Sequence, residues 1–276
     1  MSRYLIITAD DVGLCPEVNH ASILAAREGI VTSLDVMPNA PYFLEAARMI
    51  HGLHHELFDT GLHLCLNSEF SDFRWTPLLS NREVPSLYDD KGYCFRTVKE
   101  LHENFNINEL QKEIQAQIRY ALDTLLNITH VTRHMYALDG LEGVRREDVW
   151  RFIAEMAKQH KVAIRSTDNK EAIWLEKQNT PIVRQVCTES HDIPVDRKKE
   201  EYIRLIKNLQ PGISEFIVHC GYDRGKLKEI TAFASRREKD FELMMDPDIK
   251  DVIRGEKIEL ICWQKVSGLL KMGQVL

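Results

Sequence analysis

The chain has 276 residues, 44% of them hydrophobic, and a formal net charge of −6. Its length suits one large domain or two ordinary ones, and we expect one barrel-sized domain over residues 1–276. Because the charge is spread along the chain without a basic block, neither a nucleic acid nor an anionic membrane is the expected partner.

The cysteine and apolar patterns indicate a cytoplasmic protein. The six cysteines occur singly and without a CxxC pair, which is typical of reduced thiols. The first apolar run is too short for a signal peptide, and no apolar stretch approaches the roughly 20 residues that a membrane span needs.

Strand-like and helix-like segments alternate along the chain. Tyr4–Ala9 predicts a strand, and Pro16–Glu28 predicts a helix with proline at its first position. Further strands are predicted at Ile30–Met37, Thr60–Leu66, Ile128–Met135, Val162–Ser166, Ile182–Cys187, Phe216–His219 and Ile258–Trp263. Helices are predicted at Tyr42–Ile50 and Ile107–Leu126, with helical stretches between most of the remaining strands.

About eight β/α units result, which places the chain in the α/β class with a mostly parallel sheet. This repetition over a barrel-sized length favours a single (β/α) barrel, TIM-barrel-like and irregular in strand number, over an open doubly wound sheet. The sequence contains no GxGxxG or Walker loop that would support nucleotide binding.

Polar residues recur where the predicted strands end. Asp10 and Asp11 follow the first strand, His63 lies in GLHLCLN, and His134 and His219 close two later strands. In a barrel the carboxyl ends of the strands form one rim, so these residues converge there.

The adjacent acids Asp10 and Asp11 predict a cation nearby. Two neighbouring residues of a strand point to opposite sides, so Asp10 and Asp11 share a site only if the chain bends, which Gly13 permits. Two carboxylates in one pocket repel unless a cation lies beside them. Asp11, His63 and His134 would form a set of two histidines and one carboxylate that leaves positions open for water and substrate, with Asp10 as general base.

Each residue also has a structural alternative. The acid pair would serve as a helix N-cap, and His63 would be a hydrogen-bonded interior histidine. His130 lies on the same face of its strand as His134 but roughly 13 Å away, so we expect it to pack beneath the site.

The chain resembles the YdjC-like family of carbohydrate deacetylases, to which the chitooligosaccharide deacetylases belong. The resemblance rests on ITADDVGLCPEVNHASILAAREGIVTSLDVMPN, GLHLCLN, THVTRH and HCGYD. It extends through PSLYDDKGYCFR and REKDFELMMDPDIKDVIRGEKIELICW, so it covers most of the chain.

The resemblance implies an irregular barrel that removes acetyl groups from N-acetylated sugars with one divalent metal ion. It implies Asp11, His63 and His134 as ligands, Asp10 as general base, and His219 as the acid that protonates the leaving amine. The family suggests Mg²⁺, whereas nitrogen-rich ligation favours Zn²⁺.

The chain departs from the family at four positions. The family usually has Phe at Val12, Asp at Thr132, a further histidine at Tyr136 and Pro at Cys220. The change at Thr132 removes a carboxylate beside His134, which would alter the activity or the substrate.

Three residues are candidates for contact with the substrate, namely Arg165, Trp75 and Tyr222. Arg165 would alternatively form an ion pair at the surface. Trp75 belongs to the aromatic-rich connection between Asn67 and Thr97, whose rings would either stack on sugars or bury the connection's own core.

Two other functions are compatible with the same residues. One is a barrel phosphoesterase or amidohydrolase, for which Arg224 and Lys226 offer a basic hint. The other is a catalytically weakened sugar-binding relative. We expect a small carbohydrate as partner and leave a homodimer open.

Overall fold

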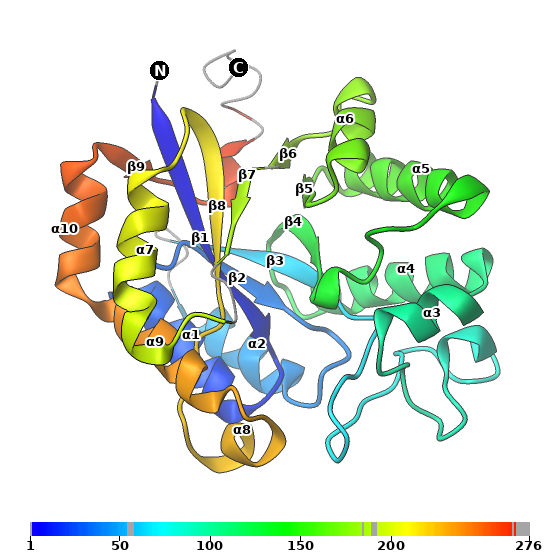
Figure 1. The fold of residues 1–276 in the computed structure, drawn as a ribbon. Coiled ribbons are helices and arrows are strands. Elements are labelled where there is room, and N and C mark those ends of the chain that lie inside the picture. The colour runs from blue at the N-terminus through cyan, green and yellow to red at the C-terminus, as the bar shows by residue number, and fades with distance from the viewer. Residues whose placement is uncertain (1, 54–57, 184, 189–191, 267, 269–276) are drawn as a thin grey trace.

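The computed structural model describes residues 2–53, 58–183, 185–188, 192–266 and 268, and it shows a nearly closed parallel barrel surrounded by helices (Figure 1). Within the described residues the sheet has nine strands in the order β6-β5-β4-β3-β2-β1-β8-β7, with β9 paired to β1. All pairings between these strands are parallel. The predicted barrel is therefore confirmed, and the open doubly wound sheet is excluded.

The strands are β1 Arg3–Val12, β2 Ser33–Val36, β3 Asp59–Leu64, β4 Ile128–Arg133, β5 Ala163–Arg165, β6 Ile182–Val183, β7 Gln185–Cys187, β8 Gly212–Val218 and β9 Ile258–Leu260. The helices are α1 Pro16–Glu28, α2 Phe43–His51, α3 Val98–Asn104, α4 Ile107–Asp123, α5 Gly143–His160, α6 Asn169–Lys177, α7 Lys198–Lys207, α8 Gly225–Ile230, α9 Ala234–Met245 and α10 Pro247–Gly255.

Most predicted elements are found, with shifted ends. The helix predicted at Pro16–Glu28 has those bounds, whereas the helix predicted to reach Leu126 ends at Asp123. The single strand predicted at Ile182–Cys187 is wrong, because the segment forms two short strands that pair with different neighbours. β6 pairs with β5, and β7 pairs with β8, so one segment contacts both sides of the opening.

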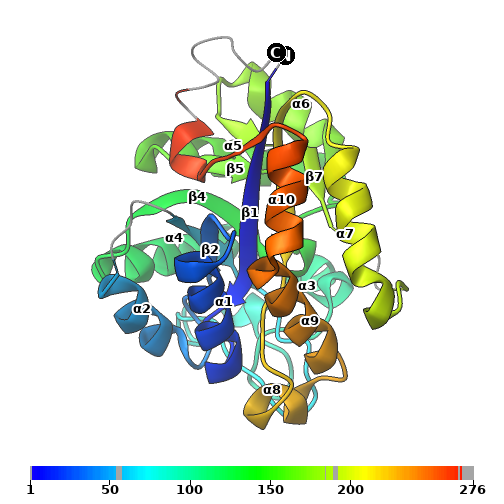
Figure 2. The same cartoon turned by 90° about the vertical axis from the view of Figure 1, so that its left-hand side faces the viewer.

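The longest strand, β1, spans the barrel from end to end (Figure 2). One edge pairs with β8 from Arg3 to Ala9. The other edge pairs with β9 at Arg3–Leu5 and with β2 from Thr8 onward. This strand therefore joins the first and last parts of the sheet.

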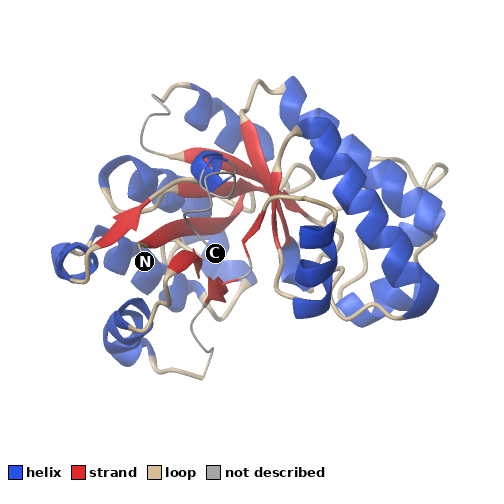
Figure 3. Ribbon diagram, turned by 90° about the horizontal axis from the view of Figure 1, so that it is seen from above, coloured by secondary structure: helices blue, strands red, loops and turns tan. Residues whose placement is uncertain are grey.

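Seen from above, the strands lie at the centre and the helices surround them (Figure 3). Alternate residues of β1 belong to different cores: Leu5 and Ile7 join the large core that includes the helices, whereas Tyr4 and Ile6 join a smaller cluster with Trp263. Burying such side chains contributes about 1.5 to 3 kcal/mol each. The smaller cluster lies at the beginning of β1, and the buried acid Asp10 lies further along the same strand.

The six cysteines are all unpaired, as predicted. Burial raises the pKa of Cys15 to about 12 and raises the pKa of Cys65 well above its ordinary value, so these thiols are unreactive. Among the described residues no helix is both long and apolar enough to cross a membrane.

Candidate active site

The chain reverses the direction of one side chain at the end of β1. Asp10 continues the series of Tyr4 and Ile6 into the barrel, and Asp11 would by alternation point to the helices. However, Asp11 has a left-handed φ of 67°, and the register with β2 shifts between Ala9 and Val12. A non-glycine residue in this conformation costs about 1 to 2 kcal/mol. The predicted bend thus begins at Asp11 itself rather than at Gly13.

The bend brings both acids to one place, where they are buried with exposed fractions of 4% for Asp10 and 2% for Asp11. Neither acid caps the following helix, because the N-cap of α1 is Cys15. The alternative that this pair is a helix cap is therefore wrong.

Asp11 meets the two predicted histidines. Its Oδ1 lies 3.5 Å from His63 Nε2 and 3.0 Å from His134 Nδ1. His63 lies near the end of β3, and His134 lies just past the end of β4. Ligand atoms of one ion bound at 2.0 to 2.2 Å are themselves about 3.0 to 3.5 Å apart. The three side chains form a buried group that could hold a metal ion.

Each of these three side chains has its other polar atom held by a partner. Arg237 Nη2 donates to Asp11 Oδ2 at 2.6 Å. Thr132 Oγ1 lies 2.7 Å from His63 Nδ1, and Glu69 Oε2 lies 3.0 Å from His134 Nε2. Partners of this kind orient metal ligands and fix the tautomers of histidines.

Without an ion, this group depends on a proton for its charge balance. Burial alone would lower the pKa of His134, but the carboxylates of Glu69 and Asp11 raise it to about 10. Burial alone would raise the pKa of Asp11, but Arg237 and His134 hold it well below its ordinary value. A protonated His134 between two carboxylates thus provides a positive charge where a metal ion could lie.

Asp10 is held differently, by an arginine. Arg165 Nη1 and Nη2 donate to its two oxygens at 2.7 and 2.9 Å. The same guanidinium donates to Glu215, with Nε to Oε2 at 2.8 Å and Nη2 to Oε1 at 2.6 Å. Arg165 is only 4% exposed, so the alternative of an ion pair at the surface is wrong.

A second buried group, Asp10, Asp35 and His63, also has the spacing of metal ligands. Both oxygens of Asp10 are bound by Arg165, and both oxygens of Asp35 have partners in His130 and Thr132, whereas Asp11 Oδ1 faces only the two histidines. The chemistry of the donors therefore fits a metal ion better at Asp11 than here.

His219 lies just past the end of β8 and is half-buried. Its backbone N–H donates to Asp240 Oδ2 at 3.2 Å, and Asp240 Oδ1 lies 2.7 Å from Lys198 Nζ. Burial lowers the pKa of His219, although the charges of Asp11 and Asp10 act against this effect. A rigid network therefore fixes the backbone at His219.

Trp75 lies beside the metal candidate. It is 4% exposed, its ring centroid is 6.3 Å from that of His134, and its indole N–H donates to Cys65 Sγ at 3.1 Å. Trp75 and Phe95 are buried, which agrees with the alternative that the aromatic connection buries its own core. Phe70 and Phe73, which flank Trp75, are half-buried.

The aromatic connection is anchored to α4. Glu113, 1% exposed, accepts from the backbone N–H groups of Leu78 and Leu79 at 2.8 and 3.0 Å. Gln117, one turn later, bonds both the N–H and the C=O of Cys65. The connection therefore has a fixed position over this end of the barrel.

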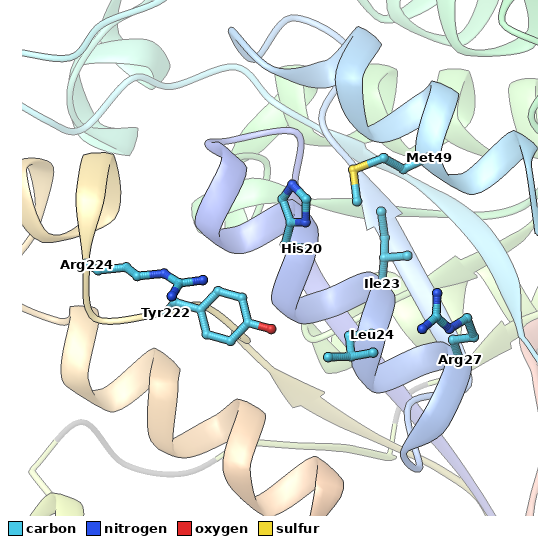
Figure 4. Close-up of a pocket in the computed structure, with 7 residues that line it drawn as sticks. All are labelled: His20, Ile23, Leu24, Arg27, Met49, Tyr222 and Arg224. Carbon is cyan, nitrogen blue, oxygen red and sulfur yellow. The ribbon is translucent and has the colours of Figure 1, made fainter.

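Tyr222 lies in a different pocket, between α1, α2 and the start of α8 (Figure 4). The pocket is lined by His20, Ile23, Leu24, Arg27, Met49, Tyr222 and Arg224. None of these residues belongs to the Asp11 group, and the contact of Tyr222 with substrate stays a prediction.

The two basic residues that favoured a phosphoesterase, Arg224 and Lys226, have partners outside the site. Arg224 stacks over the Tyr222 ring at 4.5 Å, and Lys226 pairs with Glu229 at 2.6 Å. Neither cation is available where the acids and histidines converge.

The sequence analysis did not identify four residues that contact the site: Asp35, Glu69, Glu215 and Arg237. Asp35 and Glu215 are buried acids within β2 and β8, and an acid inside a predicted strand, as Asp35 is in Ile30–Met37, is a signal that could have found it. Glu69 lies in a connection and Arg237 on a polar helix, so neither had a distinguishing pattern.

Known proteins resemble this chain in both sequence and fold. The sequence profile of the family described as "YdjC-like protein" matches residues 4–255. A carbohydrate deacetylase of Thermoanaerobacter pseudethanolicus is 29% identical over 259 residues, which cover 94% of this chain and 97% of that protein. A carbohydrate deacetylase of Brevibacillus brevis is 22% identical over 269 residues, which cover 95% of this chain and 99% of that protein.

The fold resembles that of a solved structure. A crystal structure of an Enterococcus faecalis V583 protein, named for cellobiose-phosphate cleavage, matches with a TM-score of 0.81 and 22% identity. The match covers 96% of this chain and 99% of that chain. At this identity the likeness supports the fold alone.

Proposed function

This chain belongs to the YdjC-like family, and from that premise we propose that it is a metal-dependent hydrolase that removes acetyl groups from N-acetylated carbohydrates. Chitooligosaccharides or related N-acetyl sugars are the proposed substrates. The relatives named carbohydrate deacetylase support this substrate class.

One observation carries the proposal. Asp11 Oδ1, His63 Nε2 and His134 Nδ1 face one another, while Arg237, Thr132 and Glu69 occupy the other polar atom of each. A purely structural cluster has no need of three donors that are oriented toward one shared point. The two nitrogens favour Zn²⁺ by ligand chemistry, and the family resemblance favours Mg²⁺.

The bound ion would polarise the acetyl carbonyl and lower the pKa of a water molecule. Asp10 Oδ2, 3.8 Å from His63 Nε2, would accept the proton from this water. Arg165 uses one lone pair of each Asp10 oxygen and leaves another for that proton. His219 would protonate the departing amine, and because burial lowers its pKa, it must first gain a proton.

The decisive experiment combines metal analysis with an assay of acetate release. The protein is treated with a chelator, reloaded separately with Mg²⁺ or Zn²⁺, and incubated with N-acetylglucosamine oligomers. We expect acetate only from the reloaded samples. Release of phosphate from sugar phosphates without release of acetate would favour the phosphoesterase, and sugar binding without either product would favour the weakened relative.

A further inference from the structure

The site has two halves, the candidate metal ligands Asp11, His63 and His134, and Asp10 with its partner Arg165. A fully buried carboxylate lies between them. Asp35, on β2, is 0% exposed. Its Oδ2 accepts a short hydrogen bond from the Thr132 hydroxyl, and its Oδ1 lies 2.7 Å from His130 Nε2. Arg165 Nη2 is 3.4 Å from the same Oδ2, so Asp35 adjoins the arginine that binds Asp10.

The direction of these hydrogen bonds fixes the tautomer of His63. A hydroxyl has one hydrogen, and a carboxylate can only accept, so Thr132 donates to Asp35. The Thr132 oxygen must then accept from His63 Nδ1–H at 2.7 Å. The lone pair of His63 consequently lies on Nε2, the atom that faces Asp11 Oδ1 at 3.5 Å.

Asp35 is itself held in place by close packing. His130 stacks on Trp263 with centroids 4.4 Å apart and an interplanar angle of 7°. A Cβ atom at Gly61 would lie 2.2 Å from His130 Nε2 and 2.4 Å from Asp35 Oδ1, so only glycine fits at this position of β3. The arrangement is therefore built into three adjacent strands.

We propose that Asp35 is a positioning residue for both halves of the site: through Thr132 it holds His63 in the tautomer that binds the ion, and beside Arg165 it steadies the partner of Asp10. The part that concerns the ion rests on the proposed function. Thr132 on β4 is then a relay between His63 on β3 and the carboxylate of Asp35 on β2.

The first test removes single members of the relay. Asp35→Asn and Thr132→Val should each weaken Zn²⁺ binding by about 10- to 100-fold, measured by competition with a chromophoric chelator. Thr132→Ser keeps the hydroxyl and should bind within about 2-fold of the wild type. The matched control is Glu171→Gln, because Glu171 is a buried carboxylate that pairs with Arg133 outside the site. It should lower the melting temperature without changing Zn²⁺ affinity.

The second test moves the carboxylate. In the double variant Asp35→Thr, Thr132→Asp, the acid at position 132 can accept from His63 Nδ1–H directly, but the contact with Arg165 is lost. Zn²⁺ affinity should therefore recover relative to Asp35→Thr alone, whereas kcat for acetate release should stay low at an unchanged KM. This split separates the two roles of Asp35.

The result that overturns the inference is wild-type Zn²⁺ affinity in both Asp35→Asn and Thr132→Val, with a loss of melting temperature like that of Glu171→Gln. Imidazole ¹⁵N shifts provide a readout that needs neither metal nor activity. They should report a protonated Nδ1 on His63 in the wild type, and an unprotonated Nδ1 would overturn the relay. A wild-type protein that binds no ion but has this tautomer would contradict the proposed function and leave the relay supported.

Discussion

Asp10 and Asp11 are neighbours in the chain, and each pairs with an arginine, yet their surroundings differ. Both oxygens of Asp10 are bound by Arg165, which also binds Glu215. Only one oxygen of Asp11 is bound by Arg237, and the other faces His63 and His134.

The difference shows how a fold gives separate roles to two identical side chains. At Asp10 the protein binds both carboxylate oxygens through Arg165, so this carboxylate has fewer positions open to an added ion. At Asp11 it supplies half of the contacts and turns the rest toward two imidazoles. We therefore expect substitutions on the Asp11 side to change metal binding first, and substitutions on the Asp10 side to change turnover first.

The largest effect is expected for the histidines. His63→Ala and His134→Ala each remove one of three proposed ligands, so bound metal should fall to background and acetate release should cease. His51→Ala, an exposed histidine of α2, is the control. Metal content is measured by elemental analysis after dialysis. If both variants keep full metal, the proposed ligand set is wrong.

Asp10→Asn should have the next largest effect. The variant should retain the ion, because Asp11, His63 and His134 are unchanged, and acetate release should slow by at least about 100-fold, the lower range for a lost general base. Metal content and kcat are measured on one sample. Loss of the ion in this variant would show that Asp10 is itself a ligand, and the two acids would then not have separate roles.

Metal binding on the Asp11 side should depend on pH. The pKa of His134, raised to about 10 by Glu69 and Asp11 against the effect of burial, means that a proton occupies the imidazole of the metal-free protein at neutral pH. The ion needs the neutral ring, so apparent affinity should rise by up to about tenfold per pH unit between about pH 7 and 9. Calorimetry in buffers of different ionisation enthalpy should count about one proton released per ion.

The stability of the metal-free protein should change with pH in the opposite direction to its metal affinity. The raised pKa of His134 stabilises the metal-free fold fully below its ordinary value of 6.5, and this contribution is lost as the pH rises through about 10. A melting temperature of the metal-free protein that does not fall over this range would contradict the charge balance at Asp11.

The smallest effect is expected for Glu69→Gln. Glu69 is 21% exposed at its side chain and orients His134 from the loop, so its loss should weaken metal binding by at most about 10-fold. The amide can still accept from His134 Nε2–H, which preserves the geometry. An effect as large as that of His134→Ala would mean that Glu69 is a fourth ligand.

The barrel was predictable because hydrophobic periodicity determines it. The alternation of period two and period 3.6 reports which face of each segment is buried, and eight such units close most economically as a barrel. The exchange of neighbours between β6 and β7 was not predictable, because it depends on the distance between β5 and β8 rather than on local sequence.

The site was predictable only in part. Residues at strand ends, such as His63 and His134, could be placed together because parallel strands share a rim. The direction of Asp11 depends on a left-handed φ, which aspartate adopts more often than most residues but which the local sequence does not require. Arg237 comes from α9, and its contact with Asp11 follows from helix packing alone.

The pairing of β1 with the last strands also affects how the chain is made. Arg3 pairs with Gly212 of β8 and Ile258 of β9, which leave the ribosome roughly 200 residues or more later. At about 5 to 20 residues per second, the first strand waits on the order of 10 to 50 s for these neighbours. Throughout this interval the edge of β1 that later pairs with β8 can pair with other chains. A chaperone that covers this first strand would therefore protect the nascent polypeptide most.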